Sequence, residues 1–148
     1  AAAVMSMLNK TAAETAADFE ISACTDVTGF GLAGHLVEVA KGSGKEISLS
    51  AGMVPTLKSA KEFANMGFVP AGAHKNRKFF ESSIRVEQGV DRALADILFD
   101  PQTSGGLLIF LKNSEADSLI KKLKSNGVNA AVIGEVTREN EQGFLNII

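Results

Sequence analysis

The residue types best suited to chemistry lie between positions 25 and 31, where polar side chains run into a glycine-rich turn. A strand followed by such a turn and a helix presents backbone N–H groups and the positive end of a helix dipole, and both attract phosphate. A carboxylate there is the kind of oxygen ligand that Mg²⁺ prefers. The candidate residues for nucleotide phosphates are Thr25, Asp26, Thr28, Gly29 and Gly31, and Asp26 is also the candidate metal ligand.

The same segment fits a purely structural interpretation as well. The side-chain oxygen of Asp26 or Thr28 could cap the following helix, and the glycines could simply allow a tight turn. Residue types alone do not separate a phosphate site from a capped helix, so both interpretations stay open at this point.

A second polar, glycine-rich turn occupies residues 100–106, with the sequence Asp-Pro-Gln-Thr-Ser-Gly-Gly. It leads into an apolar stretch instead of a helix, and Asp-Pro and Gly-Gly are also ordinary turn formers. The segment therefore either contributes to a site or only changes the direction of the chain.

Three other polar features are weaker candidates. The basic run at residues 74–78 lies in a predicted loop, where it could meet phosphates in a larger site or remain a solvated surface. His35 lies one helical turn from Glu38, but no further His or Cys completes a metal set, so we predict a surface or interface histidine. Cys24 has no histidine nearby to activate it, and we predict a small buried residue.

Hydrophobic periodicity predicts the elements that position the first turn. Glycines, which readily take positive φ, mark the predicted helix ends in this half of the chain. The predicted elements are a helix over 1–19, a strand over 21–25, a helix from 31 that ends at Gly42 and Gly44, a strand over 46–49, a helix over 57–66 that ends at Gly67, and a long loop over 69–84.

The second half of the chain continues the alternation of helices and strands. Helical spacing returns over 90–97 and stops at the turn, because proline disfavours a helix at its predecessor. Ser114 and Asp117 form a predicted capping box for the next helix. The other predicted elements are an apolar strand over 107–111 buried on both faces, a helix end at Gly127, and closing strands over 130–136 and 144–148 joined across a polar turn at 138–143. This alternation indicates an α/β or α+β layered fold.

Length and composition limit the classes of protein to which the chain can belong. Its 148 residues are 45% hydrophobic, enough for one core, so we expect a single domain over 1–148. The 15 basic and 17 acidic residues form no basic stripe, which argues against nucleic acid as a partner. The apolar stretches are too short to cross a membrane. A single cysteine favours the cytoplasm, and the missing initiator methionine suggests a piece of a longer chain.

Two motifs carry a resemblance to a known family. Residues 23–36, Ala-Cys-Thr-Asp-Val-Thr-Gly-Phe-Gly-Leu-Ala-Gly-His-Leu, and residues 100–108, Asp-Pro-Gln-Thr-Ser-Gly-Gly-Leu-Leu, together resemble selenophosphate synthetase (selenide, water dikinase). The similarity runs from about Asn9 to the end and covers the C-terminal half of that enzyme. The wider superfamily includes aminoimidazole ribonucleotide synthetase, thiamine-monophosphate kinase and a hydrogenase maturation factor.

This resemblance implies a fold and a reaction. The fold is the C-terminal domain of the aminoimidazole ribonucleotide synthetase type, a mixed sheet layered with helices and partly ferredoxin-like. The domain would belong to a two-domain, homodimeric enzyme of selenium metabolism that converts ATP, selenide and water into selenophosphate, AMP and phosphate. Alternatives are another ATPase of the superfamily, such as aminoimidazole ribonucleotide synthetase, or a non-catalytic dimerisation or nucleotide-binding module.

The resemblance also implies roles for particular residues. Asp26 matches the aspartate that joins N-terminal carboxylates in binding Mg²⁺ around ATP, and its neighbours in the turn match the phosphate path. The 100–106 segment matches a signature of the family, which serves either as a wall of the site or in inter-domain packing. At His74 the chain departs from the family pattern. The reactive cysteine or selenocysteine and its adjacent lysine precede this region, so the resemblance places no catalytic side chain here and predicts no activity for the fragment alone.

Overall fold

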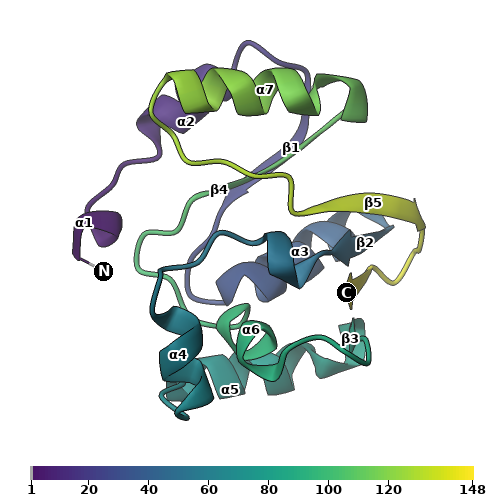
Figure 1. Ribbon diagram of the computed structural model, residues 1–148. Coiled ribbons are helices and arrows are strands. Elements are labelled where there is room, and N and C mark those ends of the chain that lie inside the picture. Colours follow the sequence, from purple (N-terminus) through teal and green to yellow (C-terminus); the bar gives the residue numbers. More distant parts are fainter. Residues whose placement is uncertain (1) are drawn as a thin grey trace. The chain divides into compact units, whose positions relative to one another are not determined.

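The computed structural model describes residues 2–148 and divides into two compact units (Figure 1). The first unit contains the chain up to Val27 together with Thr103–Val132, and the second contains Thr28–Gln102 together with Ile133–Ile148. None of the helices among these described residues is long and apolar enough to cross a membrane.

The first unit is a two-stranded sheet with helices packed against it. Strands β1 (Ile21–Asp26) and β4 (Leu107–Leu111) pair antiparallel. Helices α2 (Lys10–Ala16) and α7 (Asn113–Ser125) lie side by side (Figure 1). Their buried residues Ala16, Leu119 and Leu123 form a core with apolar side chains from both strands. The predicted strand over 21–25 is confirmed.

Three predictions for this unit are wrong. The helix expected over 1–19 is two helices, α1 (Ala2–Met5) and α2, with Ala1 outside the described residues. They are separated where the Asn9 amide donates to Gly105 O (3.0 Å) and the Ser104 hydroxyl donates to Met7 O (3.1 Å). Strand β4 has one partner, so only Leu108 is buried. Helix α7 begins after Lys112 and has no side-chain cap at its start, so the predicted capping box is absent.

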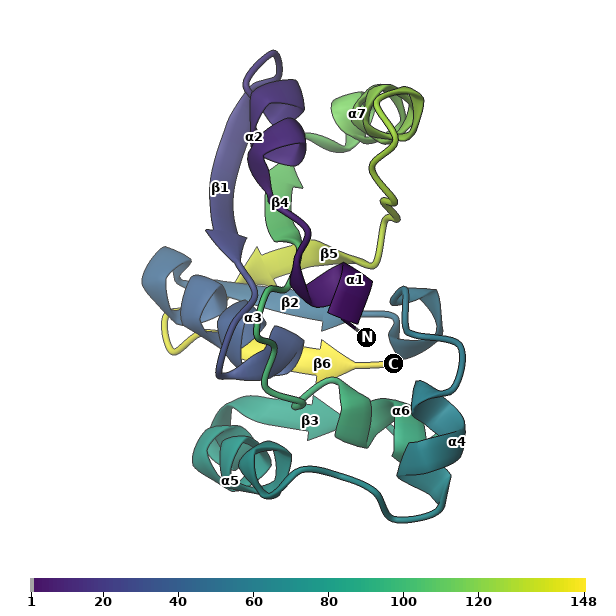
Figure 2. The same cartoon turned by 90° about the vertical axis from the view of Figure 1, so that its left-hand side faces the viewer.

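The second unit contains a mixed four-stranded sheet with the order β3-β6-β2-β5 (Figure 2). Strands β2 (Lys45–Leu49) and β5 (Gly134–Glu139) pair antiparallel, whereas β6 (Phe144–Ile147) runs parallel to β2 and to β3 (Ile84–Val86). The closing strands β5 and β6 are therefore not neighbours, because β2 lies between them. The predictions of a mixed sheet and of a strand over 46–49 are confirmed.

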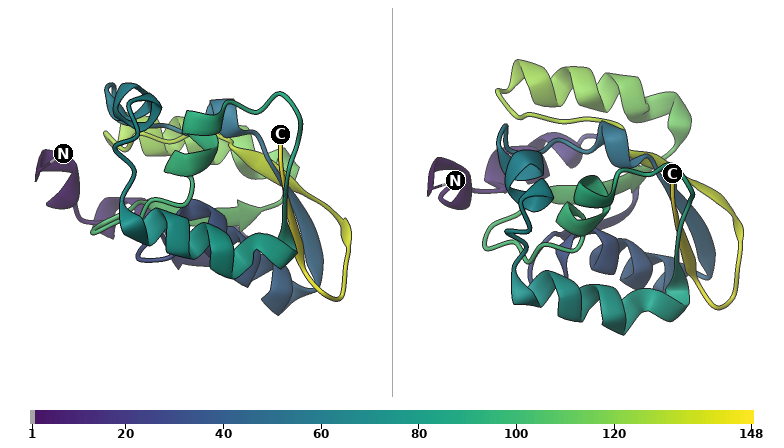
Figure 3. Two further views of the ribbon diagram at one scale, coloured as in Figure 1. Left: turned by 90° about the horizontal axis from the view of Figure 1, so that it is seen from below. Right: turned by 60° about the horizontal axis from the view of Figure 1, so that its bottom comes forward.

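Helices of the second unit cover this sheet and one another. Helix α3 (Gly31–Ser43) packs on β2 and β6 and ends at Gly44, which has φ +62° as a helix C-terminus often requires. Helix α5 (Ala71–Phe80) runs beside α3 (Figure 3), so the loop predicted over 69–84 is wrong. The other helices are η1 (Ala51–Met53), α4 (Ala60–Asn65), η2 (Glu81–Ser83) and α6 (Arg92–Ile97).

A buried carboxylate ties three strands of this sheet together. Glu46 on β2 is 7% exposed and accepts two hydrogen bonds from the Arg138 guanidinium of β5, at 3.0 and 2.9 Å. Asn146 of β6 donates at 2.7 Å and Asn140 at 3.3 Å. The hydrogen bond from Arg138 is the largest cause that lowers the pKa of Glu46 below its ordinary value of 4.5. The charged form is therefore favoured in the folded protein.

We expect Glu46→Gln to lower the stability of the protein in a pH-dependent way. A carboxyl whose pKa is lowered on folding adds stability above its unfolded pKa, and that stability is lost as the pH falls through the folded pKa. The difference from wild type should be full at about pH 7 and vanish at strongly acidic pH, as measured by urea unfolding. Glu139→Gln, at an exposed partner of Lys45, is the control and should change little. A pH-independent difference would contradict this interpretation.

Candidate functional site

The two glycine-rich segments that the sequence singles out are hydrogen-bonded to each other. In the first unit, Asp26 ends β1 opposite Leu107 of β4. The ladder extends by one more residue, because Val27 N–H donates to Gly106 O (3.0 Å) and Gly105 N–H donates to Val27 O (3.1 Å). The structure therefore brings the end of the 100–106 turn against the end of β1, where it extends the pairing of β1 with β4.

Gly105 is required for this close approach. A Cβ atom at this position would lie 2.2 Å from the carbonyl oxygen of Val27, far inside van der Waals contact. Only a residue without a side chain lets the two backbones exchange their hydrogen bonds at this point.

Asp26 is exposed at the end of its strand. Residues along β1 alternate between half-buried and exposed, which places Cys24 and Asp26 on the exposed face and Thr25 on the half-buried face. The Thr25 hydroxyl donates to the backbone oxygen of Asp26 (3.2 Å). Among residues 2–148, no three His, Cys, Asp or Glu side chains are close enough to hold a metal ion together. The Asp26 carboxylate fits Mg²⁺ as one ligand of a shared site and cannot form a site by itself.

Cys24 is exposed, so the prediction of a buried residue is wrong. Partial burial of its thiol and the negative charge of Asp26 both raise its pKa. The thiolate, which is the nucleophilic form of cysteine, is therefore disfavoured. The reason for the exposure is the two-residue period of the strand, which places Cys24 on the same face as Asp26.

In the second unit, both the carbonyl oxygen and the N–H group of Thr28 make hydrogen bonds. Its carbonyl oxygen accepts hydrogen bonds from Gln102 N–H and Gly31 N–H, both at 3.0 Å. Its own N–H donates to His35 Nε2 (3.0 Å), and its hydroxyl lies 3.2 Å from the same nitrogen. Within this unit, the hydrogen bond between residues 28 and 102 is thus a second link between the two glycine-rich segments.

His35 is buried, so the surface alternative of the predicted surface or interface histidine is wrong. Its Nδ1 atom lies 3.2 Å from the Glu38 carboxylate, one helical turn away. Helical periodicity predicts that His35 and Glu38 are neighbours. The contact of His35 with Thr28 depends instead on the turn that precedes α3.

Gly29 and Gly31 are fixed by contacts from other elements. Asn76 of α5 donates to Gly29 O (2.8 Å) and to Phe99 O (3.1 Å). Gly31 has φ +68°, and a Cβ there would lie 2.7 Å from the carbonyl carbon of Phe99. In the sequence Asn76 is only one member of a basic run, and no local pattern links it to Gly29.

The start of α3 bears on both interpretations of this turn. Phe30 is the N-cap residue and no side chain caps the helix, so neither Asp26 nor Thr28 has the capping role that the structural interpretation required. The expectation that this turn presents its backbone N–H groups to a phosphate is corrected in part. The N–H groups of Thr28, Gly31 and Ala33 already have acceptors in the protein, so they are not donors for a phosphate.

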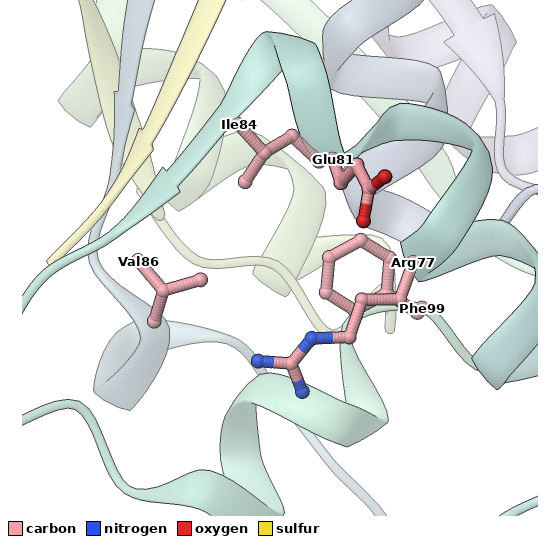
Figure 4. Close-up of a pocket in the computed structure, with 5 residues that line it drawn as sticks. All are labelled: Arg77, Glu81, Ile84, Val86 and Phe99. Carbon is pink, nitrogen blue, oxygen red and sulfur yellow. The ribbon is translucent and has the colours of Figure 1, made fainter.

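The remaining predicted basic residues do not act as one cluster. His74, Lys75 and Lys78 are exposed on α5, whereas Arg77 pairs with Asp96 and lies 5.6 Å from the centre of the Phe99 ring. Arg77 lines a pocket of about 190 Å³ together with Glu81, Ile84, Val86 and Phe99, and none of the residues 25–31 lines it. Figure 4 shows these five side chains. The acidic Glu81 in this pocket opposes an anion there.

Asp100 is the other acidic residue of the two segments. Burial is the largest cause that raises its pKa, and the side-chain amide of Gln102 donates to its carboxylate (3.1 Å) and partly offsets that effect. The same amide also donates to the backbone oxygen of Asp100 (3.1 Å). Gln102 therefore stabilises this turn from both its side chain and its backbone.

Comparisons with known proteins agree on one family. A family model described as "AIR synthase related protein, C-terminal domain" matches residues 1–145. The chain is 43% identical over 145 residues to "Selenide, water dikinase 2" of Peptoclostridium acidaminophilum, covering 97% of this chain and 42% of the relative. It is 46% identical over 136 residues to "Selenide, water dikinase" of Pelobacter propionicus, covering 91% and 39%. The chain thus spans about 40% of the length of these relatives.

A solved structure with the same fold supports the architecture. The crystal structure of E. coli HypE, a hydrogenase maturation protein, superposes with a TM-score of 0.58 at 21% identity, over 90% of this chain and 34% of that one. At this identity the likeness shows the fold alone. The predicted fold class, a mixed sheet with helices in a C-terminal domain of this type, is confirmed.

The two site glycines make a matched pair for a stability test. Gly31→Ala should lower the free energy of unfolding by about 2 to 4 kcal/mol, because the positive φ and the Phe99 backbone both oppose a Cβ. Gly29→Ala should change it by less than about 1 kcal/mol, since a Cβ there has no atom within 4 Å. Urea unfolding of the two variants measures the difference. Equal effects would show that the close approach at Gly31 is not a constraint.

Proposed function

The chain belongs to the family of AIR synthase related protein C-terminal domains, and on that premise we propose that it is the C-terminal domain of a selenide, water dikinase. In this proposal it contributes to the Mg-ATP site of an enzyme that makes selenophosphate, AMP and phosphate from ATP, selenide and water. The identities of 43% and 46% to two such dikinases, over nearly the whole chain, support this assignment over another ATPase of the superfamily.

The observation that carries the proposed role is the position of Asp26. Its carboxylate is exposed at the end of β1, and the residue after it is paired with a glycine-rich segment that admits no side chain. An exposed carboxylate held by a fixed backbone is available to a ligand that a further domain brings to this face. A buried Asp26 would have opposed the proposal.

Phosphoryl transfer depends mainly on positioning and on neutralising charge, so the protein needs little covalent chemistry of its own. When bound, Mg²⁺ would neutralise negative charge on the phosphate oxygens. Asp26 would be one of its ligands, together with carboxylates of an N-terminal domain. Thr25, Thr28, Gly29 and Gly31 would line the phosphate path. No side chain of this chain is proposed to react, and the raised pKa of Cys24 agrees with that.

The share of the relatives that the chain matches also suggests its partners. Because it spans about 40% of their length, we propose that an N-terminal domain of the same protein completes the site. We further propose a homodimer working in the cytoplasm, with ATP and selenide as substrates. The 148-residue chain alone is then expected to be inactive.

The test of the metal role is Asp26→Asn in the full-length protein. Loss of one Mg²⁺ ligand should lower selenide-dependent AMP formation on the order of a hundredfold and raise the Mg²⁺ concentration needed for half-maximal rate. The melting temperature should not fall, because the side chain is exposed. Asp117→Asn, at an exposed position on α7, is the matched control and should keep the wild-type rate.

Two results would contradict the proposal in different ways. Normal AMP formation in Asp26→Asn would remove the metal role. A wild-type protein that forms no AMP with selenide, yet turns over the ribonucleotide substrate of aminoimidazole ribonucleotide synthetase, would assign the chain to that enzyme instead.

A further inference from the structure

The hydrogen bond between Thr28 and His35 shows which nitrogen of the His35 ring carries the proton. A backbone N–H can only donate, so the 3.0 Å contact from Thr28 N–H requires an unprotonated His35 Nε2 with its lone pair directed at the amide. The proton of the neutral ring must then lie on Nδ1, where the Glu38 carboxylate accepts it at 3.2 Å. Glu38 therefore selects the tautomer that holds the turn.

The surroundings of the ring keep it in this position. His35 is 8% exposed, and the Phe30 ring lies 5.9 Å from it, centre to centre. Phe30 in turn packs edge-on against Phe80 of α5, 5.4 Å away. Glu38 is the charged group that contacts the ring among the described residues, and the aromatic neighbours are neutral. The imidazole has little freedom to rotate away from Thr28.

The same lone pair cannot fully serve two donors. Nε2 has one lone pair and the Thr28 N–H occupies it, so the Thr28 hydroxyl, 3.2 Å from Nε2, keeps its proton for another acceptor. We propose that His35 is a positioning residue that fixes the Thr28 peptide and directs the Thr28 hydroxyl proton toward an anionic oxygen of the bound ligand. That this oxygen belongs to an ATP phosphate rests on the function proposed above.

The hydrogen bond itself can be measured without any ligand. In the ¹⁵N-labelled chain, a through-bond ¹⁵N–¹⁵N coupling should connect the Thr28 amide with His35 Nε2, and the shifts of the imidazole nitrogens should report a proton on Nδ1. Glu38→Leu removes the acceptor of that proton from an exposed position and should weaken or abolish the coupling. A wild-type chain that shows a protonated Nε2, or no coupling, would overturn the proposal whatever reaction the protein performs.

The role of the hydroxyl is tested by kinetics in the full-length protein. Thr28→Val should lower kcat/KM for ATP about tenfold, while Thr28→Ser, which keeps the hydroxyl, should retain it. His35→Phe should cause a similar loss, and His35→Gln, whose amide oxygen can accept the Thr28 N–H, should recover part of it. Combining Thr28→Val with His35→Phe should add little, because both act through one hydroxyl.

The outcomes separate this inference from the proposed function. Thr28→Val with wild-type kcat/KM for ATP would overturn the positioning role, even if the coupling is observed and Asp26→Asn is inactive. If His35→Phe does not fold, the Thr28→Val and Thr28→Ser pair still decides, because both change a half-buried side chain by one group. Failure of the proposed function would appear in Asp26→Asn and leave the NMR result unchanged.

Discussion

The candidate site depends on main-chain hydrogen bonds between the residues that follow β1 and those that precede β4. Val27 exchanges two such bonds with Gly105 and Gly106. Since side chains on a strand alternate between its faces, a slip of one residue in this register would move Asp26 from the exposed face to the half-buried one. The absence of a side chain at Gly105 permits this register. The face on which the Asp26 carboxylate lies therefore depends on the lack of a Cβ atom at Gly105.

The loop that follows is held by side chains as well as by backbone. His35 from α3 and Asn76 from α5 bind the Thr28 amide and the Gly29 carbonyl, and Gln102 binds the Thr28 carbonyl through its backbone. The elements that supply these groups are themselves anchored, because α3 packs on β2 and β6 and contacts α5. A loop fixed before its ligand arrives loses little entropy on binding, which is the property that a phosphate-handling site needs.

In the proposed function the chain supplies one part of a metal site, and this division has a physical reason. Mg²⁺ bound to a nucleotide takes carboxylate, water and phosphate oxygens, and several carboxylates gathered on one small domain would repel one another without the ion. Among the described residues, Asp26 has no two further acidic or histidine side chains close enough to complete a set. A site shared between domains assembles that charge only when the ion and the nucleotide are present to neutralise it.

Local pattern was enough to predict much of this structure. The strand that ends at Asp26, the helix that starts at Gly31 and ends at Gly44, and the strand that became β2 follow from apolar periodicity and glycine position, which are properties of neighbouring residues. The same is true of the two glycine-rich segments, because their composition is unusual wherever they fold. Even the pairing of His35 with Glu38 is a consequence of helical spacing.

Only the tertiary structure decided what those residues contact. Asn76 reaches Gly29 across 47 positions, and Gly105 meets Val27 across a larger separation, so no periodicity within either segment could reveal them. The burial of His35 and the partial exposure of β4 depend on the elements that pack against them, namely the Thr28 turn and a sheet with only two strands. Sequence by itself determined which segments could do chemistry; the long-range contacts determined which face each side chain occupies and which partner holds it.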